Sequence, residues 1–319
     1  MSARSWVAVT ALVGLTASVG LFFGARQSAP RIALQELRAR YGTVESKYTT
    51  VAGMRIHYRD EGQGPVVVLL HGSFGNLHTF DGVVAALHTR YRFIRYDQVH
   101  SGLSDPVPAN LQMTPELFLQ QFLDSIGVRS AAFVGTSSGG IIAYRFAATY
   151  PERTNALILA NVPPSAPVDN AGAQARVPWR LRQSIAVCLR YSRPWSRTCF
   201  RDFLNSTVHR PGIVTAALVE QYYDLNRRPD AGTMSSLAAI MRKDEQVLTF
   251  LAQVKAPTLL IWGALDHVLQ PPTADLLIQR LTATRAQKLL LADVSHYPPL
   301  EAPLEVAADI DHFLQPPLP

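Results

Sequence analysis

Short apolar runs alternate with helical patterns over most of this 319-residue chain. The clearest run is 66–70, Val-Val-Val-Leu-Leu, which lies between Gly64-Pro65 and Gly72. Continuous apolar runs are typical of strands buried on both faces of a parallel sheet. The same reading predicts further buried strands at 92–96, 131–134, 156–160, 258–262 and 288–291.

The segments between these runs carry helical signals. Residues 114–126 have an apolar stripe at a spacing of about 3.6, with Thr114 as N-cap and Pro115 at the first helical position. Further helices are predicted at 140–149 and 303–314, and a polar helical linker at 31–45, while strands 47–51 and 54–59 flank a hairpin turn. This alternation predicts an α/β fold with a doubly wound, mostly parallel, eight-stranded sheet.

The alternation stops between residues 163 and 253, where the sequence is rich in arginine and helical in pattern. Because strands resume in the same style afterwards, this stretch is predicted to be a helical cap inserted into a core formed by 31–162 and 254–319. The chain has a net charge of +6, and residues 163–255 alone have a balance of +6. No run of basic residues occurs, so nucleic-acid binding is not expected. The positive charge could instead attract carboxylate-bearing substrates or anionic lipid headgroups.

Residues 1–30 form a separate segment. An uncharged, mostly apolar run spans 6–24 and is long enough to cross a bilayer as a helix. It is expected to be a membrane anchor, with a cleaved export signal as the alternative. The side of the membrane stays open, because more arginines follow the run than precede it.

The two cysteines, Cys188 and Cys199, both lie in the predicted cap. In an exported protein they could form a disulfide, whereas in a reducing compartment they would be free thiols, which is the favoured interpretation. Neither cysteine has the spacing of a metal site. We therefore expect no metal and no cofactor.

The segment Gly135-Thr136-Ser137-Ser138-Gly139 matches G-x-S-x-G. A strand precedes it directly and a helix follows it directly. A serine at such a turn is held in a strained backbone conformation that exposes its hydroxyl above the sheet, and small neighbours allow the backbones to approach closely. Ser137 is thus the predicted nucleophile.

Another turn, His71-Gly72-Ser73-Phe74-Gly75, follows the strand at 66–70. Its backbone can aim an N–H group at the position above the nucleophile. The N–H groups of Ser73 and Ser138 are therefore predicted to form an oxyanion hole. Phe74 is the alternative donor and is expected to line the pocket, with His71 and Gly72 nearby.

A serine hydroxyl needs a base within hydrogen-bond reach. His296 follows the predicted strand at 288–291, and Asp266 follows the strand at 258–262. Both are expected at the same sheet edge as Ser137. His296 would then act as the base and Asp266 as the acid that orients it, in the chain order Ser, Asp, His.

The chain resembles the α/β-hydrolase superfamily, in its branch of capped lipases, esterases and dehalogenase-like enzymes. The residues that carry the resemblance are His71-Gly72, Tyr96-Asp97, Ser101-Gly102-Leu103-Ser104, Gly135–Gly139, Gly263–Asp266, and His296 with Pro298 and Glu301. The resemblance implies that Ser137 attacks a carbonyl carbon and that water later frees an acyl-enzyme. Haloalkane dehalogenases and epoxide hydrolases are similar too, but they place aspartate at the nucleophile position.

One loop departs from the family pattern D-x-x-G-x-G-x-S. His100 takes the place of the first glycine, while Gly102 and Ser104 are kept. His100 is a candidate pocket residue, although a position on the protein surface is the favoured interpretation.

We therefore expect a serine hydrolase that cleaves a carboxylic ester of a hydrophobic small molecule or lipid. The alternatives are a carbon–carbon bond hydrolase and a proline-type aminopeptidase, which use the same triad. A binding module that has lost activity is disfavoured because all three triad residues are present. The substrate and the oligomeric state stay open.

Overall fold

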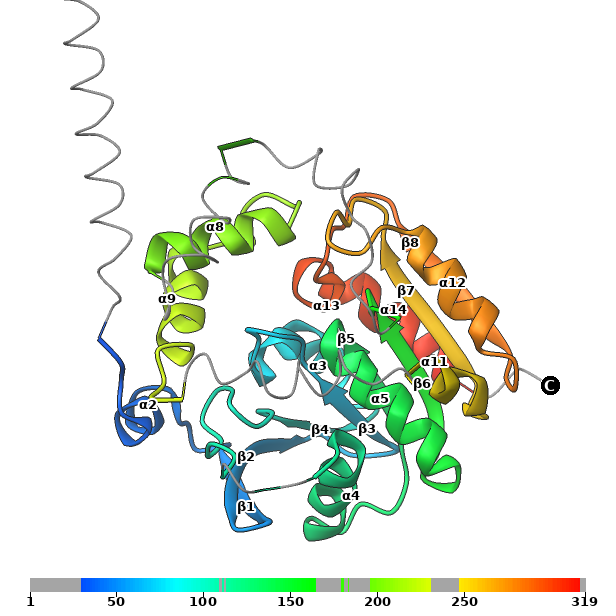
Figure 1. Ribbon diagram of the computed structural model, residues 1–319, viewed down its shortest axis with the longest axis horizontal. Helices are drawn as coiled ribbons and strands as arrows, with labels where there is room; N and C mark the ends of the chain where they lie inside the picture. The colour runs from blue at the N-terminus through cyan, green and yellow to red at the C-terminus, as the bar shows by residue number, and fades with distance from the viewer. Residues whose placement is uncertain are drawn as a thin grey trace, which may run out of the picture.

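The computed structural model describes residues 30–108, 111, 113–164, 179, 180, 183, 196–230 and 247–315. Its centre is a sheet of eight strands with helices on both faces (Figure 1). The strands are β1 (Lys47–Val51), β2 (Met54–Glu61), β3 (Val66–Leu70), β4 (Arg92–Tyr96), β5 (Ala131–Thr136), β6 (Thr154–Ala160), β7 (Thr258–Gly263) and β8 (Ala286–Leu291).

The strand order across the sheet is β1-β2-β4-β3-β5-β6-β7-β8. The pairs β1–β2 and β2–β4 are antiparallel, and the remaining pairs are parallel. After the antiparallel pair β1–β2, the chain enters the parallel part at β3, passes to β4 on one side, and then crosses over to β5, β6, β7 and β8 on the other side. The prediction of a doubly wound, mostly parallel, eight-stranded sheet is confirmed.

The helices of the described residues are α2 (Leu34–Tyr41), η1 (Leu77–Phe80), α3 (Asp81–Leu87), α4 (Pro115–Ser125), α5 (Ser138–Thr149), η2 (Pro151–Arg153), α8 (Arg197–Thr207), α9 (Ala216–Leu225), α11 (Val247–Gln253), α12 (Pro272–Arg280), α13 (Pro298–Glu301) and α14 (Pro303–Leu314). Thr114 is the N-cap of α4, as predicted, since its side chain accepts a hydrogen bond from the N–H of Leu117. Helices α3 and α12 are additions to the sequence prediction.

Two apolar layers hold the sheet, one on each face. Alternate residues of the central strands, such as Val68 and Leu70 of β3, face α4, α5, α11 and α12. Their neighbours Val67 and Leu69 face α3 and α14 on the opposite side (Figure 1). Burial of both faces explains why these strands are uninterrupted apolar runs in the sequence.

Strand β8 departs from the prediction of a strand buried on both faces. It lies at the edge of the sheet, next to β7. Four of its six residues are exposed, and Leu290 is 51% exposed. The apolar pattern Leu289-Leu290-Leu291 therefore predicted the strand correctly but its burial wrongly, because composition does not distinguish a central strand from an edge strand.

Residues 196–230, the longest described part of the predicted cap, contain α8 and α9 and contact the core at the carboxyl ends of the strands, where the Thr207 carbonyl accepts the His296 N–H. Cys199 at the start of α8 is disulfide-bonded, so the preference for free thiols was wrong. The chain's other cysteine, Cys188, lies outside the described residues, as does the apolar run 6–24. Among the described residues no helix combines the length and the apolar character needed to span a bilayer.

Candidate active site

Ser137 lies at the junction between β5 and α5, at the carboxyl edge of the sheet. Its backbone has φ 50° and ψ −127°, a conformation that L-residues rarely adopt. The neighbouring Gly135 and Gly139 lie so close to other backbone segments that a side chain would not fit. A Cβ on Gly139 would lie 2.2 Å from the Leu70 carbonyl oxygen, and one on Gly135 would lie 2.5 Å from the Gly140 Cα. The start of α5 thus packs directly on the end of β3, as G-x-S-x-G predicts.

His296 follows β8 and points at Ser137. Its Nε2 lies 3.2 Å from Ser137 Oγ, and its Nδ1 lies 2.9 Å from Asp266 Oδ2. The loop is fixed on both sides of the ring, since the His296 N–H donates to the Thr207 carbonyl at 2.9 Å and the Ser295 N–H donates to Glu301 at 2.9 Å. The structure therefore brings the three predicted triad residues into one hydrogen-bonded chain.

Asp266 is buried, with its carboxylate surrounded by donors. Oδ1 accepts the N–H groups of Val268 and Leu269 at 2.7 and 2.9 Å. Burial acts to raise the pKa of Asp266, but the charge and hydrogen bond of His296, together with the backbone donors, hold the pKa below its ordinary value. An ionised carboxylate can only accept, so Nδ1 of His296 carries the hydrogen and Nε2 is left as the acceptor for the serine proton.

Asn161 is a site residue that the sequence analysis missed. It is buried at the end of β6 with φ 48°. Its Nδ2 donates to Asp266 Oδ2 and to the Ser295 carbonyl, and its Oδ1 accepts the Gly263 N–H at 3.1 Å. One side chain thus fixes the acid, its strand and the histidine loop. The available signal was a polar residue directly after a buried strand, of a type that tolerates positive φ.

The turn after β3 lies against Ser137, the predicted nucleophile. A Cβ on Gly72 would lie 2.8 Å from Ser137 Cβ, so only glycine fits there. The buried His71 ring donates from Nδ1 to the Gly72 carbonyl at 2.8 Å and accepts the Gln98 N–H on Nε2 at 3.0 Å. Burial lowers the pKa of His71, which keeps this tautomer neutral. Within the described residues, no acceptor meets the backbone N–H of Ser73 or Ser138.

His100 is buried rather than on the protein surface, so the favoured interpretation was wrong. It keeps φ 65° in place of the usual glycine and is only 8% exposed. Its Nδ1 lies 2.9 Å from Asp230 Oδ2, and Arg228 binds the same carboxylate and the carbonyls of Ser101 and Gly102. Within the described residues His100 thus connects the loop after β4 to the segment after α9.

Aromatic rings connect His296 to α8. Tyr297 lies 5.0 Å from His296 and 6.5 Å from Phe203 of α8, measured between ring centroids. Phe203 in turn lies 5.3 Å from Phe74, which has φ 61° and packs on Phe200. One wall beside the site is therefore apolar. Phe74 belongs to this wall, and its predicted place in the substrate pocket stays a prediction.

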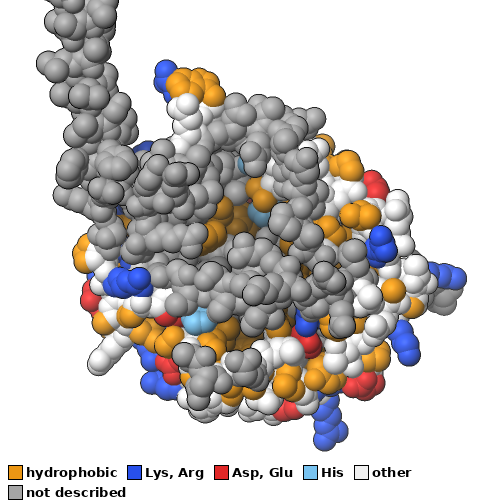
Figure 2. Space-filling model, viewed as in Figure 1, with side chains coloured by type: hydrophobic (Ala, Val, Ile, Leu, Met, Phe, Trp, Pro, Cys, Tyr) orange, Lys and Arg blue, Asp and Glu red, His pale blue; other side chains and the backbone are white. Residues whose placement is uncertain are grey.

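The arginines of residues 196–230 each contact a carboxylate. The pairs are Arg197–Glu220, Arg201–Asp202, Arg210–Asp293 with Glu305, Arg227–Asp224 and Arg228–Asp230. On the face shown in Figure 2, lysine and arginine side chains are scattered among acidic ones and do not form one patch. The positive charges of the arginines at 196–230 are thus compensated by neighbouring carboxylates.

A second Ser–His–Asp chain occurs on the outer strands. His57 of β2 lies 2.7 Å from Asp97 through Nδ1 and 2.8 Å from Ser46 Oγ through Nε2. Asp97 also accepts the N–H groups of Leu77 and Leu103 at 2.9 and 2.8 Å. Ser46 is half-buried in a turn and accepts the Thr43 N–H at 3.1 Å.

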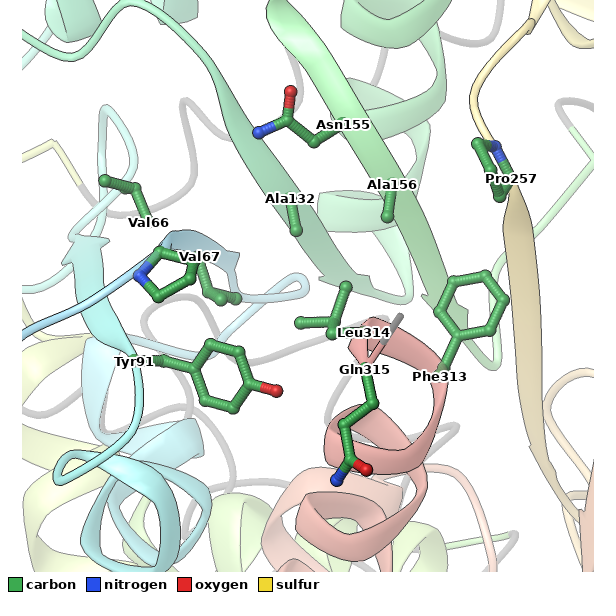
Figure 3. Close-up of a pocket in the computed structure, with 11 residues that line it drawn as sticks. Val66, Val67, Tyr91, Ala132, Asn155, Ala156, Pro257, Phe313, Leu314 and Gln315 are labelled. Atoms are coloured by element: carbon green, nitrogen blue, oxygen red, sulfur yellow. The ribbon is translucent and has the colours of Figure 1, made fainter. Parts of the chain in front are cut away.

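A cavity of about 490 Å³ opens at the opposite edge of the sheet (Figure 3). It is lined by the first residues of β3, β5 and β6, including Val66, Ala132 and Ala156, and by the end of α14. Because Ser137, Asp266 and His296 follow the carboxyl ends of their strands, this cavity is separate from the site.

Comparison with known proteins places the chain among hydrolases. It is 28% identical to haloalkane dehalogenase 2 of Mycobacterium tuberculosis, over 83% of this chain and 93% of that protein. It is 27% identical to lipase 1 of Psychrobacter immobilis, over 83% and 82%. It is also 27% identical to the 2-hydroxy-6-oxo-6-phenylhexa-2,4-dienoate hydrolase of Burkholderia cepacia, over 70% and 80%.

The fold is shared with solved structures as well. A bacterial membrane phospholipase A superposes with a TM-score of 0.70 at 22% identity and covers 98% of both chains. The family model described as alpha/beta hydrolase fold matches residues 65–303, which include Ser137, Asp266 and His296. The chain belongs to the α/β-hydrolase fold family.

Proposed function

We propose that this hydrolase cleaves a carboxylic ester of a hydrophobic small molecule or lipid, through an acyl-enzyme on Ser137. The observation that carries the proposal is the hydrogen-bonded chain Ser137–His296–Asp266 next to two backbone N–H groups. The 3.2 Å contact between His296 Nε2 and Ser137 Oγ is close enough for proton transfer as the serine attacks.

In the proposed reaction, Ser137 Oγ forms a bond to the carbonyl carbon while its proton passes to His296 Nε2. The ionised Asp266 stabilises the resulting imidazolium. The N–H groups of Ser73 and Ser138 bind the negative carbonyl oxygen, and the N-terminus of α5 favours the same charge. His296 then protonates the departing alcohol, and a water molecule, activated by the same base, hydrolyses the acyl-enzyme.

The substrate class follows from the surroundings of the site. The wall formed by Phe74, Phe203 and Tyr297 favours an apolar group. We propose that residues 163–253 are a cap that covers the site, as their described part contacts the histidine loop through Thr207 and His296. The ion pairs of the arginines at 196–230 favour a neutral ester over an anionic substrate.

Three neighbouring reactions fit less well. Dehalogenation is disfavoured because Ser137 stands where haloalkane dehalogenases place aspartate. Carbon–carbon cleavage stays as the second candidate because of the similarity to the dienoate hydrolase. That relative's substrate is named as an acid, whereas the arginines of residues 196–230 contact carboxylates of the chain itself. An aminopeptidase would need an acidic subsite for the substrate amine, and the acidic residues of 196–230 likewise contact arginine.

We also propose that residues 6–24 tether the enzyme to a membrane. The support is the length of this apolar run and the similarity in fold to a membrane phospholipase A. Deletion of residues 1–30 should release the protein from the membrane fraction. A deletion variant that stays entirely in that fraction would overturn the tether, but not the hydrolase.

Hydrolysis of p-nitrophenyl esters of graded acyl length, with Ser137→Ala as control, tests the proposed reaction. We expect wild-type turnover with a preference for medium or long chains, and its loss in the variant. Equal rates in both proteins would exclude Ser137 as the nucleophile. No wild-type turnover, combined with cleavage of a dienoate, would favour the carbon–carbon hydrolase.

A further inference from the structure

Both peptide groups that flank Ser73 are held by hydrogen bonds to their carbonyl oxygens. The Gly72 carbonyl accepts from His71 Nδ1 at 2.8 Å and from the Gly75 N–H at 3.1 Å. The Ser73 carbonyl accepts from the Tyr297 hydroxyl at 3.1 Å. With both peptide planes fixed, the direction of the Ser73 N–H is fixed as well, because it lies opposite the Gly72 carbonyl in a planar peptide.

The side chain of Ser73 contacts the other predicted oxyanion donor. Ser73 Oγ lies 3.0 Å from Ser138 Oγ. Ser138 is the first residue of α5, where the backbone N–H has no partner within the helix. The two hydroxyl groups thus connect the two residues whose N–H groups are proposed to bind the oxyanion, and the connection sets their separation.

Tyr297 is itself held rigidly. It is 2% exposed, and its carbonyl accepts the N–H groups of Leu300 and Glu301 at 3.0 and 2.9 Å. Burial raises the pKa of its phenol, which favours the protonated form that can donate a hydrogen bond. Among the described residues, its bond to Ser73 is the one hydrogen bond between the histidine loop and the turn after β3.

We propose that Tyr297 and the Ser73–Ser138 hydroxyl pair are positioning residues that fix the oxyanion donors relative to His296 and Ser137. This inference rests on the proposed function. The three side chains form a network separate from the triad, running from the histidine loop through the turn after β3 to the start of α5. Its effect is on the transition state, because the donors must be aimed at the charge that develops there.

Removal of one oxyanion donor costs about 10²- to 10³-fold in kcat, so a donor that is present but poorly aimed should cost less, about 10-fold. We expect this loss in kcat for Tyr297→Phe on p-nitrophenyl butyrate, with KM nearly unchanged. Butylboronic acid, which forms a tetrahedral adduct with the serine oxygen, should bind the variant more weakly by a similar factor.

Tyr91→Phe is the matched control. Tyr91 is also buried, and its hydroxyl donates to Asp311 at 2.9 Å, but it lies at the opposite edge of the sheet. Both variants lose one buried hydrogen bond and should lose a similar few degrees in Tm. A purely structural role predicts equal effects on kcat, whereas the proposal predicts a loss in Tyr297→Phe alone.

The hydroxyl pair is tested by Ser73→Ala, Ser138→Ala and the double variant. Because both hydroxyls act through one contact, the double variant should be no slower than the slower single variant. Unchanged kcat in Tyr297→Phe, or a loss of kcat that Tyr91→Phe shares, would overturn the inference while leaving the hydrolase intact. A wild type that neither hydrolyses esters nor binds butylboronic acid would overturn the proposed function and this inference with it.

Discussion

Two Ser–His–Asp chains occur in this molecule, and the chain with the shorter contacts is not the proposed active site. In Ser46–His57–Asp97 the two hydrogen bonds measure 2.8 and 2.7 Å, against 3.2 and 2.9 Å in Ser137–His296–Asp266. Both histidines bind a buried carboxylate through Nδ1. Distances within a triad therefore do not identify a nucleophile.

The surroundings of the two serines differ. Ser137 has a strained backbone at a strand-to-helix turn, and two N–H groups without described partners lie nearby. Ser46 lies in a surface turn, where its hydroxyl already accepts the Thr43 N–H. Asp97 accepts hydrogen bonds from the N–H groups of Leu77 and Leu103, which lie in two different loops. The second Ser–His–Asp chain therefore stabilises the fold. A reaction needs stabilisation of the developing oxyanion, which the proposed N–H donors of Ser73 and Ser138 would supply beside Ser137.

The largest expected difference is between the two serines. Ser137→Ala should reduce ester hydrolysis by about 10⁴-fold or more, since the loss of a triad serine removes covalent catalysis. Ser46→Ala should leave the rate within about 2-fold, because it removes only two hydrogen bonds at the periphery, to Thr43 and His57. Steady-state rates of both variants check this. A large loss in Ser46→Ala would invert the assignment of the two chains.

The two aspartates should separate activity from stability. Asp266→Asn should lower kcat by about 10⁴-fold with a folded protein, because the histidine tautomer is no longer fixed. Asp97→Asn should instead lower the free energy of unfolding by about 3 kcal/mol, since one carboxylate oxygen is replaced by an NH2 group that faces buried hydrogen-bond donors. Urea unfolding and kcat, measured on both variants, give the comparison. Equal stability losses would contradict the division of roles.

Asn161 is a further difference between the two Ser–His–Asp chains. It binds Asp266, whereas among the described residues no side-chain amide binds Asp97. Asn161→Ala should lower kcat by up to about 10²-fold, because Asp266 and the histidine loop lose their common support and the base is displaced. The KM should change little. A variant with wild-type kcat would show that the backbone donors of Val268 and Leu269 suffice to place the acid.

The smallest expected effect concerns acid stability. Although burial opposes it, the His57 contact and the backbone N–H of Leu103 hold the pKa of Asp97 below its ordinary value of about 4. Because the pKa is lower in the folded than in the unfolded protein, ionised Asp97 stabilises the folded state above about pH 4. This stabilisation is lost as the pH falls further and Asp97 becomes protonated. Tm measured between about pH 5 and pH 3 should therefore fall less steeply in Asp97→Asn than in the wild type. Parallel curves would contradict this contribution.

The sequence predicted the features that depend on local pattern. The β5–Ser137–α5 turn, the order of the triad and the eight strands follow from apolar runs and the residues directly after them. Burial of β8 and of His100 could not be predicted, since both depend on which segments lie alongside. Asn161 and Tyr297 were missed because their roles arise from contacts between elements distant in sequence. The second chain, Ser46–His57–Asp97, has no sequence signal either, because three separate segments supply it.

Labelling with a fluorophosphonate, followed by peptide mass spectrometry, tests the central claim most directly. The reagent transfers its phosphonyl group to the serine oxygen with loss of fluoride, and it requires no knowledge of the natural substrate. We predict one modified peptide, which contains Ser137, and no adduct in Ser137→Ala. An adduct on Ser46, or an unmodified Ser137 in a folded wild-type protein, would contradict the account.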